Sequence, residues 1–145
     1  MRAVVQRARS ARVDVGDECV GSIETGLCVL VGVTHDDTEE QAVKLARKLH
    51  GLRVFDDDEG VMNRSIDDIG GEMLIVSQFT LYGDASKGRR PSWTQAARPE
   101  HAEPLIERVV AELRELGVRV ETGRFRADML VTIENDGPCT IILEL

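Results

Sequence analysis

The stretch EMLIVSQFTLYGD, Glu72 to Asp84, predicts the centre of the fold. It begins with a short, continuous apolar run, which is typical of a strand buried in a sheet. We expect this central strand to extend from Glu72 to Tyr82. Within it, the residues from Ser77 to Thr80 bring two hydroxyl groups and an amide to the point where a buried strand meets solvent. We therefore expect a functional site at Ser77, Gln78, Phe79 and Thr80.

Segments on both sides of this strand have the patterns of further strands and of two helices. The segments 38–51 and 100–116 carry apolar residues at helical spacing, and Thr38 with Gln41 forms a capping box. Gly51 and Gly117 follow the last helical residues. Apolar runs and alternation predict the other strands at 3–9 and 11–15 (one or two strands), 27–34, 52–55, 118–122, 128–134 and 139–145. These elements predict a single α+β domain over residues 1–145, with several antiparallel strands.

The distribution of charge is more informative than its total. A net charge of −8 argues against a protein that attracts nucleic acid through a general positive field. Residues 1–12 and 85–99, however, contain arginine and lysine and no acid. The acids are concentrated elsewhere, at 36–40, 56–59 and 67–68. A local basic surface can therefore bind a few phosphates, although solvated surface charge explains the same residues.

The cysteines and the apolar runs indicate the class of protein. Cys19, Cys28 and Cys139 are odd in number, have no metal-ligand spacing and lie in strand-like segments, so we expect buried, reduced thiols. The longest apolar run, Leu27 to Val33, is too short for a membrane helix, and the first residues have no uninterrupted apolar stretch. We expect a cytoplasmic protein that does not bind a membrane.

The residues show no evident acid–base or metal chemistry. An activated serine or threonine needs a base within hydrogen-bond reach, but His35, His50 and His101 occupy positions common on protein surfaces. The acidic runs are typical of turns, and no cluster has the spacing of metal ligands. We therefore expect no metal and no cofactor, and a reaction that depends on positioning and on backbone groups.

A second motif, NDGPCT at Asn135 to Thr140, is interpreted together with the first. About 5–6% of X–Pro bonds in folded proteins are cis, and a cis Gly137–Pro138 bond turns successive carbonyls to one side. The pair SQFTL and NDGP resembles the signature of the D-aminoacyl-tRNA deacylase family, and the resemblance extends from Met1 to Leu145. It implies a mostly antiparallel, β-barrel-like sheet with two flanking helices, in a homodimer.

The resemblance also implies the activity. The enzyme would bind the 3′ end of aminoacyl-tRNA and hydrolyse the ester of a D-amino acid, or of glycine mischarged on tRNA, as in Gly-tRNA(Ala). Catalysis would be RNA-assisted: the ribose 2′-hydroxyl would help to place water, and backbone amides near Phe79 and Thr80 would stabilise the developing charge. Gly137 and Pro138 would enter the partner subunit's active site, where their carbonyls exclude an L side chain by collision.

Further residues match the family position by position. Arg7 resembles the arginine that braces the Gly–Pro turn, and Phe125 and Met129 resemble the pair that sandwiches the terminal adenine. Taken alone, Arg7 is an ordinary strand charge and Met129 an ordinary core residue. The segment KGRRPSW, Lys87 to Trp93, resembles the family's basic loop, which is suited to phosphate contacts.

Some positions and alternatives stay open. Arg126 stands where the family commonly has glycine, Trp93 where it has phenylalanine, and Cys139 where it has an aliphatic or aromatic residue. These departures concern the adenine pocket and the packing of the turn. Two other functions are a module that binds RNA or a tRNA end without cleavage, and the related deacylase that acts on L-alanine mischarged on tRNA. The SQFTL motif argues against the latter, in which the Gly–Pro bond is trans.

Overall fold

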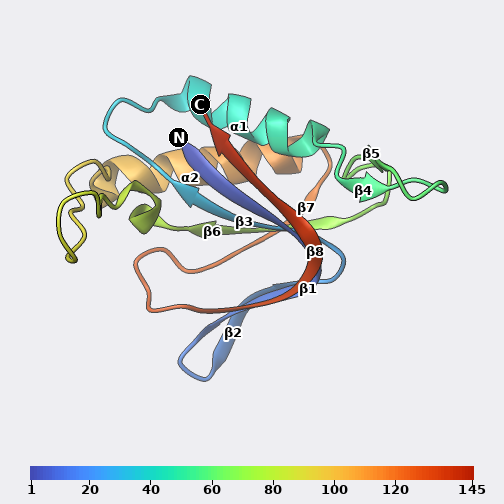
Figure 1. Cartoon of the computed structure of the whole chain (residues 1–145), viewed down its shortest axis with the longest axis horizontal. Helices are drawn as coiled ribbons and strands as arrows, with labels where there is room; N and C mark the ends of the chain where they lie inside the picture. Colours follow the sequence, from blue (N-terminus) through green and yellow to red (C-terminus); the bar gives the residue numbers. More distant parts are fainter.

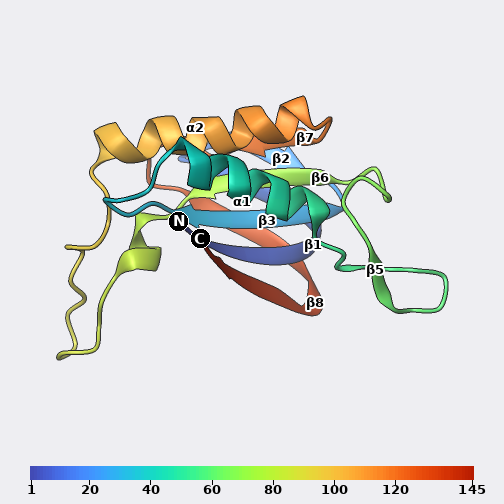
Figure 2. The ribbon, with the colours of Figure 1, turned by 90° about the horizontal axis from the view of Figure 1, so that it is seen from above.

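The computed structural model describes residues 1–145 and contains two α-helices that lie on the same side of a curved sheet (Figures 1 and 2). This confirms the predicted α+β class with two flanking helices. The elements, in chain order, are β1 (Arg2–Val15), β2 (Glu18–Ile23), β3 (Gly26–Gly32), α1 (Glu39–Gly51), β4 (Phe55–Asp56), β5 (Met62–Arg64), β6 (Glu72–Ser77), the 3₁₀ helix η1 (Phe79–Tyr82), α2 (Pro99–Glu115), β7 (Arg119–Thr122) and β8 (Leu130–Glu144).

The main sheet is organised around β1. One edge of β1 pairs antiparallel with β3 through residues 2–8 and with β2 through residues 11–15, and the other edge pairs antiparallel with β8. The β3–β6 and β6–β7 pairs are parallel, so the sheet is mixed at its centre. β1 and β8 curve together across the molecule and nearly close the sheet into a barrel (Figure 1). This confirms the barrel-like core.

Both faces of β6 are buried, which explains its continuous apolar run. Successive side chains of a strand point to opposite faces. Met73 and Ile75 belong to the larger core, which packs against both helices, whereas Leu74 and Val76 belong to a smaller core within the curve of the sheet. Met129 packs against the smaller core. The central strand therefore connects the helical layer to the inside of the barrel.

The central strand ends at Ser77 and not at Tyr82, as the sequence predicted. Its neighbours determine this end, because the last pair with β3 is Val31–Ser77 and the last pair with β7 is Ile75–Thr122. Beyond Ser77 there is no strand to pair with, and the chain turns into η1. The motif residues therefore lie on a turn at the end of the strand.

Other predicted elements agree with the structure to different degrees. α1 begins after Thr38, whose capping box with Gln41 is present, and ends at Gly51. The predicted strand 52–55 is wrong in extent: only Phe55–Asp56 is a strand, and it pairs with β5 in a two-stranded ribbon. Neither helix is long and apolar enough to cross a membrane.

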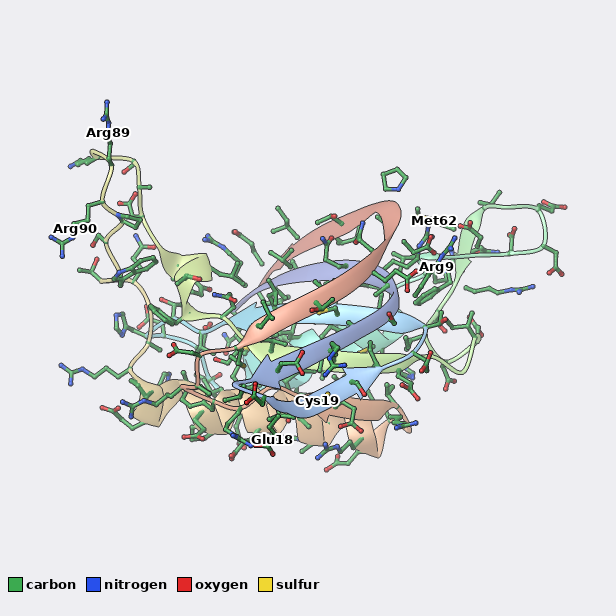
Figure 3. All side chains as sticks on the ribbon, turned by 90° about the horizontal axis from the view of Figure 1, so that it is seen from below. Arg9, Glu18, Cys19, Met62, Arg89 and Arg90 are labelled. Carbon is green, nitrogen blue, oxygen red and sulfur yellow. The ribbon has the colours of Figure 1, made fainter.

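The cysteines differ in exposure. Cys28 and Cys139 are buried, as expected, and burial raises the pKa of the Cys28 thiol to about 12. The expectation of burial is wrong for Cys19, which is exposed. Cys19 lies in β2 next to the β1–β2 turn, at a position where the register with β1 shifts, and Figure 3 shows it beside Glu18. A short outer strand near a turn leaves such a side chain uncovered.

Candidate active site

A cavity of about 570 Å³ opens where β6 ends. Ser77, Gln78 and Phe79 line it from one side, and Phe125 and Met129 line it from the segment that precedes β8. The start of α2 completes the wall. The structure therefore brings together five of the residues predicted for the site, from two segments that are far apart in the sequence.

Thr80 lies beside this cavity and contacts Gln78. The Gln78 side-chain amide Nε2 donates a hydrogen bond to Thr80 Oγ1 over 2.5 Å. The hydroxyl hydrogen of Thr80 is therefore directed elsewhere, because its oxygen already accepts a bond. No histidine is bonded to Thr80: the ring nitrogen Nε2 of His35 contacts Thr94 O and that of His101 contacts Asp37 O. Thr80 thus lacks the neighbouring base that a nucleophilic hydroxyl requires.

Two aromatic rings form the outer wall of the cavity. Phe79 is 55% exposed and meets the edge of Trp93, with 5.4 Å between ring centroids and 69° between ring planes. An edge-to-face pair of this kind is a favourable aromatic contact. Gly83 leaves room for Trp93, because a Cβ at this position would lie 2.4 Å from the indole ring. Trp93, the departure at this position, is therefore accommodated by an adjacent glycine.

The segment FRADM reaches the cavity through a tight turn. Ala127 N donates to Arg124 O over 3.2 Å, and Arg126 has a φ of 63°. This left-handed backbone favours glycine, so the departure from glycine at Arg126 leaves a glycine-like backbone conformation with a larger side chain. A Cβ at Gly123 would lie 2.6 Å from Met129 Sδ. Gly123 thus makes space for the methionine in the cavity wall.

The second motif is not a turn between two strands, as predicted, but a bulge inside the continuous strand β8. Gln6 pairs with Thr140 and Ala8 pairs with Asn135, so residues 136–139 leave the ladder opposite Arg7. Proline cannot donate to a ladder, which is why strands tolerate it at such irregular positions. The Gly137–Pro138 peptide bond is cis.

Arg7 occupies the gap that the bulge leaves and is only 7% exposed. Its Nε donates to the Asp136 carbonyl oxygen over 3.0 Å and lies 3.2 Å from the Asp136 carboxylate. Its Nη1 donates to Val54 O over 2.7 Å and lies 3.3 Å from Asp56 Oδ1. One buried guanidinium therefore connects the bulge to β4 and satisfies two backbone carbonyls.

Within one chain, the two motifs lie at opposite ends of the molecule. Arg9 is 3.9 Å from Asp136, so it marks the end with the bulge. Figure 3 shows Arg9 and Met62 toward one end of the molecule, and Arg89 and Arg90 on the basic loop at the other. Gly137 and Pro138 are exposed, and neither lines the cavity. A single chain does not bring them to Ser77 and Phe79.

Comparison with known proteins identifies the family. Residues 4–144 match the family model described as D-Tyr-tRNA(Tyr) deacylase. The chain belongs to this family. The sequence-based family assignment is thereby confirmed, together with the prediction of an enzyme of the hydrolase class.

Relatives of this deacylase family match over nearly their full length. The D-aminoacyl-tRNA deacylase of Thermus aquaticus is 58% identical over 99% of this chain and 95% of the relative. That of Halalkalibacterium halodurans is 55% identical over 99% of both. A solved structure titled c-Myc DNA Unwinding Element Binding Protein is 41% identical, with a TM-score of 0.93 over 100% of this chain and 99% of the other. A structure titled as a probable eukaryotic D-amino acid tRNA deacylase is 20% identical and has the same fold, with a TM-score of 0.86 over 99% of this chain and 98% of the other.

Sequence reasoning did not place Arg98 at this candidate site, and it named Arg126 only as a departure that concerns the adenine pocket. Arg98 and Arg126 both line the cavity. Arg98 precedes the first helical residue, Pro99, and a proline at this position is a recognisable helix-start signal that could have placed Arg98 beside the site. A second cavity of about 430 Å³ lies beside the first and shares Ser77 and Phe125 with it. No group of three or more His, Cys, Asp or Glu side chains is positioned to hold a metal ion.

Proposed function

We propose that this chain, a single domain over residues 1–145, hydrolyses the ester bond of D-aminoacyl-tRNA at its 3′ end and releases the amino acid. The observation that carries the proposal is the cavity at the end of β6, which combines Ser77–Phe79 with Phe125 and Met129 in a member of this family. Its volume of about 570 Å³ is within the range of small-ligand sites. Because its substrate is aminoacyl-tRNA, we expect the enzyme to act in the cytoplasm.

Phe125 and Met129 are suited to bind the terminal adenine. An aromatic ring stacks on a nucleobase, and a thioether is polarisable and adapts its shape to a ring. Both side chains are half-buried, so each has a surface available to a ligand while its remaining surface is supported by the protein. The ester would then lie toward Ser77 and Phe79 on the opposite wall.

The chemistry would rest on the substrate and on the backbone. Thr80 has no base, but its hydroxyl hydrogen is free to donate, since its oxygen accepts from Gln78. Phe79 and Thr80 are the first two residues of η1, so their backbone N–H groups have no acceptor within that helix. Such groups stabilise an oxyanion without a metal. The ribose 2′-hydroxyl of the tRNA, adjacent to the ester, would position the attacking water.

Rejection of L-amino acids would come from the Gly137–Pro138 segment of a partner subunit. This segment is exposed, and the buried Arg7 holds it through Asp136. Placed against a bound ester, it would collide with an L side chain, whereas a D side chain points away and glycine has none. Glycine mischarged on tRNA, as in Gly-tRNA(Ala), is therefore a second expected substrate.

A homodimer would place the Gly137–Pro138 segment of each subunit at the active site of the other. Leu130 and Ile142 on β8 are 68% and 66% exposed, and exposed apolar residues on one strand favour contact with a second protein surface. In an isologous dimer, each subunit presents the same surface to the other, so two equivalent sites form. Sedimentation analysis should give twice the mass of the chain.

The direct test compares the hydrolysis of D-tyrosyl-tRNA and L-tyrosyl-tRNA. We expect rapid release of D-tyrosine, slow release of L-tyrosine, and no loss of rate after dialysis against EDTA, because no cluster of metal-ligand side chains is present. Equal rates on both substrates would contradict the chiral filter. Loss of activity in EDTA that one added metal restores would contradict the metal-free reaction.

Substrate assistance predicts that a tRNA ending in 2′-deoxyadenosine is a poor substrate. We expect a rate at least about tenfold lower than with the natural end, because the 2′-hydroxyl would position the attacking water and the loss of such positioning slows a reaction strongly. Thr80→Ala, in contrast, should keep measurable hydrolysis. Single-turnover rates on both RNAs, with both proteins, check this. Equal rates on the two RNA ends, or a trapped acyl-enzyme on Thr80, would overturn the mechanism.

A second candidate function is nucleic-acid binding without cleavage. It is favoured by the absence of a catalytic base and by the similarity to the structure titled c-Myc DNA Unwinding Element Binding Protein. The D-tyrosyl-tRNA assay separates the two functions. A binding protein would protect the ester from spontaneous hydrolysis, whereas a deacylase accelerates its cleavage.

A further inference from the structure

Arg126 has an unusual backbone conformation beside the cavity. It has a positive φ of 63°, and every other residue with a positive φ in this chain is glycine. The hydrogen bond from Ala127 N to Arg124 O closes a turn in which Arg126 occupies the third position. With φ positive at that position the turn is of the type II class, in which glycine or asparagine is preferred. Residues other than glycine in such strained conformations are concentrated at functional sites, so we expect a function for Arg126.

The guanidinium of Arg126 has no partner within the protein. It makes no hydrogen bond and no ion pair, and the residue is exposed. Arg124, two positions earlier, shows the contrast: its Nη2 lies 3.0 Å from Glu18 Oε2. Asp128 also lines the cavity but forms no ion pair with Arg126. Arg126 therefore remains available to bind an anion.

A second unpaired arginine lines the same cavity. Arg98 immediately precedes α2, makes no side-chain cap bond and forms no ion pair. The chain as a whole carries a net charge of −8, so the two cations are not part of a general positive field. Interactions between exposed charges are screened beyond about 10 Å, which makes the local arrangement decisive for an anionic ligand.

We propose that Arg126, together with Arg98, binds the phosphate group attached to the nucleoside whose base enters the cavity between Phe125 and Met129. The inference rests on the proposed function. Phe125 and Arg126 are adjacent and line the same cavity, so a phosphate attached to a nucleoside whose base contacts the Phe125 ring is within reach of the Arg126 guanidinium. A guanidinium binds phosphate through two parallel hydrogen bonds, which a single point charge does not provide. At the 3′ end of a tRNA, the 5′ phosphate of the terminal nucleoside is the last phosphodiester of the chain.

The test compares the binding of AMP and adenosine, which differ only in this phosphate. We expect the wild type to bind AMP about tenfold more tightly than adenosine, which corresponds to about 1.4 kcal/mol, because hydrogen bonds between a guanidinium and a phosphate are charge-assisted. Arg126→Gly and Arg98→Gln should each reduce this ratio, because they lower AMP affinity more than adenosine affinity. Arg53→Gln removes a similarly exposed arginine away from the cavity and is the matched control.

Kinetics on D-tyrosyl-tRNA provide the second measurement. Arg126→Gly should raise KM and leave kcat near the wild-type value, and the salt dependence of binding should weaken by about 0.7 in logarithmic slope for one lost contact to a single strand. A wild type that does not distinguish AMP from adenosine, or variants whose ratio of AMP to adenosine affinity equals that of the wild type, overturn the inference. A wild type that binds AMP selectively but hydrolyses no D-tyrosyl-tRNA supports the phosphate site and contradicts the proposed function.

Discussion

We expect Arg7→Gln to lower kcat/KM for D-tyrosyl-tRNA by about 100-fold, because a displacement of about 1 Å in groups that position a substrate can cost about 10²-fold in rate. The guanidinium donates to two carbonyl oxygens, of Asp136 at 3.0 Å and of Val54 at 2.7 Å. The shorter glutamine side chain cannot reach both. The segment that follows Asp136, Gly137–Pro138, would lose its support, and rejection of L-tyrosyl-tRNA should weaken together with D-activity.

Arg9→Gln is the matched control for this prediction. Arg9 lies on the same strand, its side chain is 71% exposed, and it approaches the same Asp136 only at 3.9 Å. Its replacement should change the rates on D- and L-tyrosyl-tRNA by less than about twofold, because exposed ion pairs contribute little. Paired rates, with circular dichroism to verify folding, give the comparison. A folded Arg7→Gln protein with wild-type D-activity and L-rejection would contradict the proposed role of the bulge.

The second large effect concerns stability. Asp37→Ala should lower the melting temperature by about 10 °C, because removing one partner of a buried ion pair costs about 3–5 kcal/mol of unfolding free energy. Asp37 is 5% exposed, and its Oδ1 lies 2.5 Å from the Met1 amino nitrogen. Its Oδ2 accepts a hydrogen bond from Thr34 N over 2.7 Å. The substitution leaves Thr34 N without its acceptor and leaves the buried Met1 amino group with only Leu145 O, at 2.7 Å.

Asp36→Ala provides the control, since Asp36 is exposed and adjacent in sequence. It should shift the melting temperature by no more than about 1–2 °C, in keeping with the small effects of surface substitutions. Calorimetry at neutral pH measures the melting temperatures of both variants and of the wild type. If Asp37→Ala melts within 2 °C of Asp36→Ala, the buried pair does not stabilise the junction between the chain start and α1.

The sequence was sufficient for those features that depend on local interactions. α1 follows from the capping box of Thr38 and Gln41 and from apolar residues at helical spacing, which are contacts within one or two turns. The burial of both faces of β6 follows from its continuous apolar run. Five residues predicted for the site, on two segments, line one cavity. Ser77, Gln78 and Phe79 were predicted from the strand pattern, and Phe125 and Met129 from the family resemblance; their roles stay proposals.

Features that depend on partners elsewhere in the chain were not predictable. β6 ends at Ser77 because the strands beside it end there, which is a property of β3 and β7 and not of the residues 78–82. In the same way, Asn135–Thr140 has the composition of a turn, but the ladder with β1 continues on both sides of it. The local sequence could not distinguish a turn from a bulge, because both leave the same N–H groups unpaired.

By itself, the sequence determined the two helices, which follow from apolar residues at helical spacing, and the apolar faces of the helices and strands. It also determined the residue types of the two motifs. All of these depend on residues that are close together in the chain. Only the tertiary structure decided that the motifs lie at opposite ends of one subunit, and that Arg7 is buried against Asp136. It also brought Arg98 and Arg126 to one cavity. The physical reason is that sheet pairing joins residues more than a hundred positions apart, and composition carries no information on which strand pairs with which.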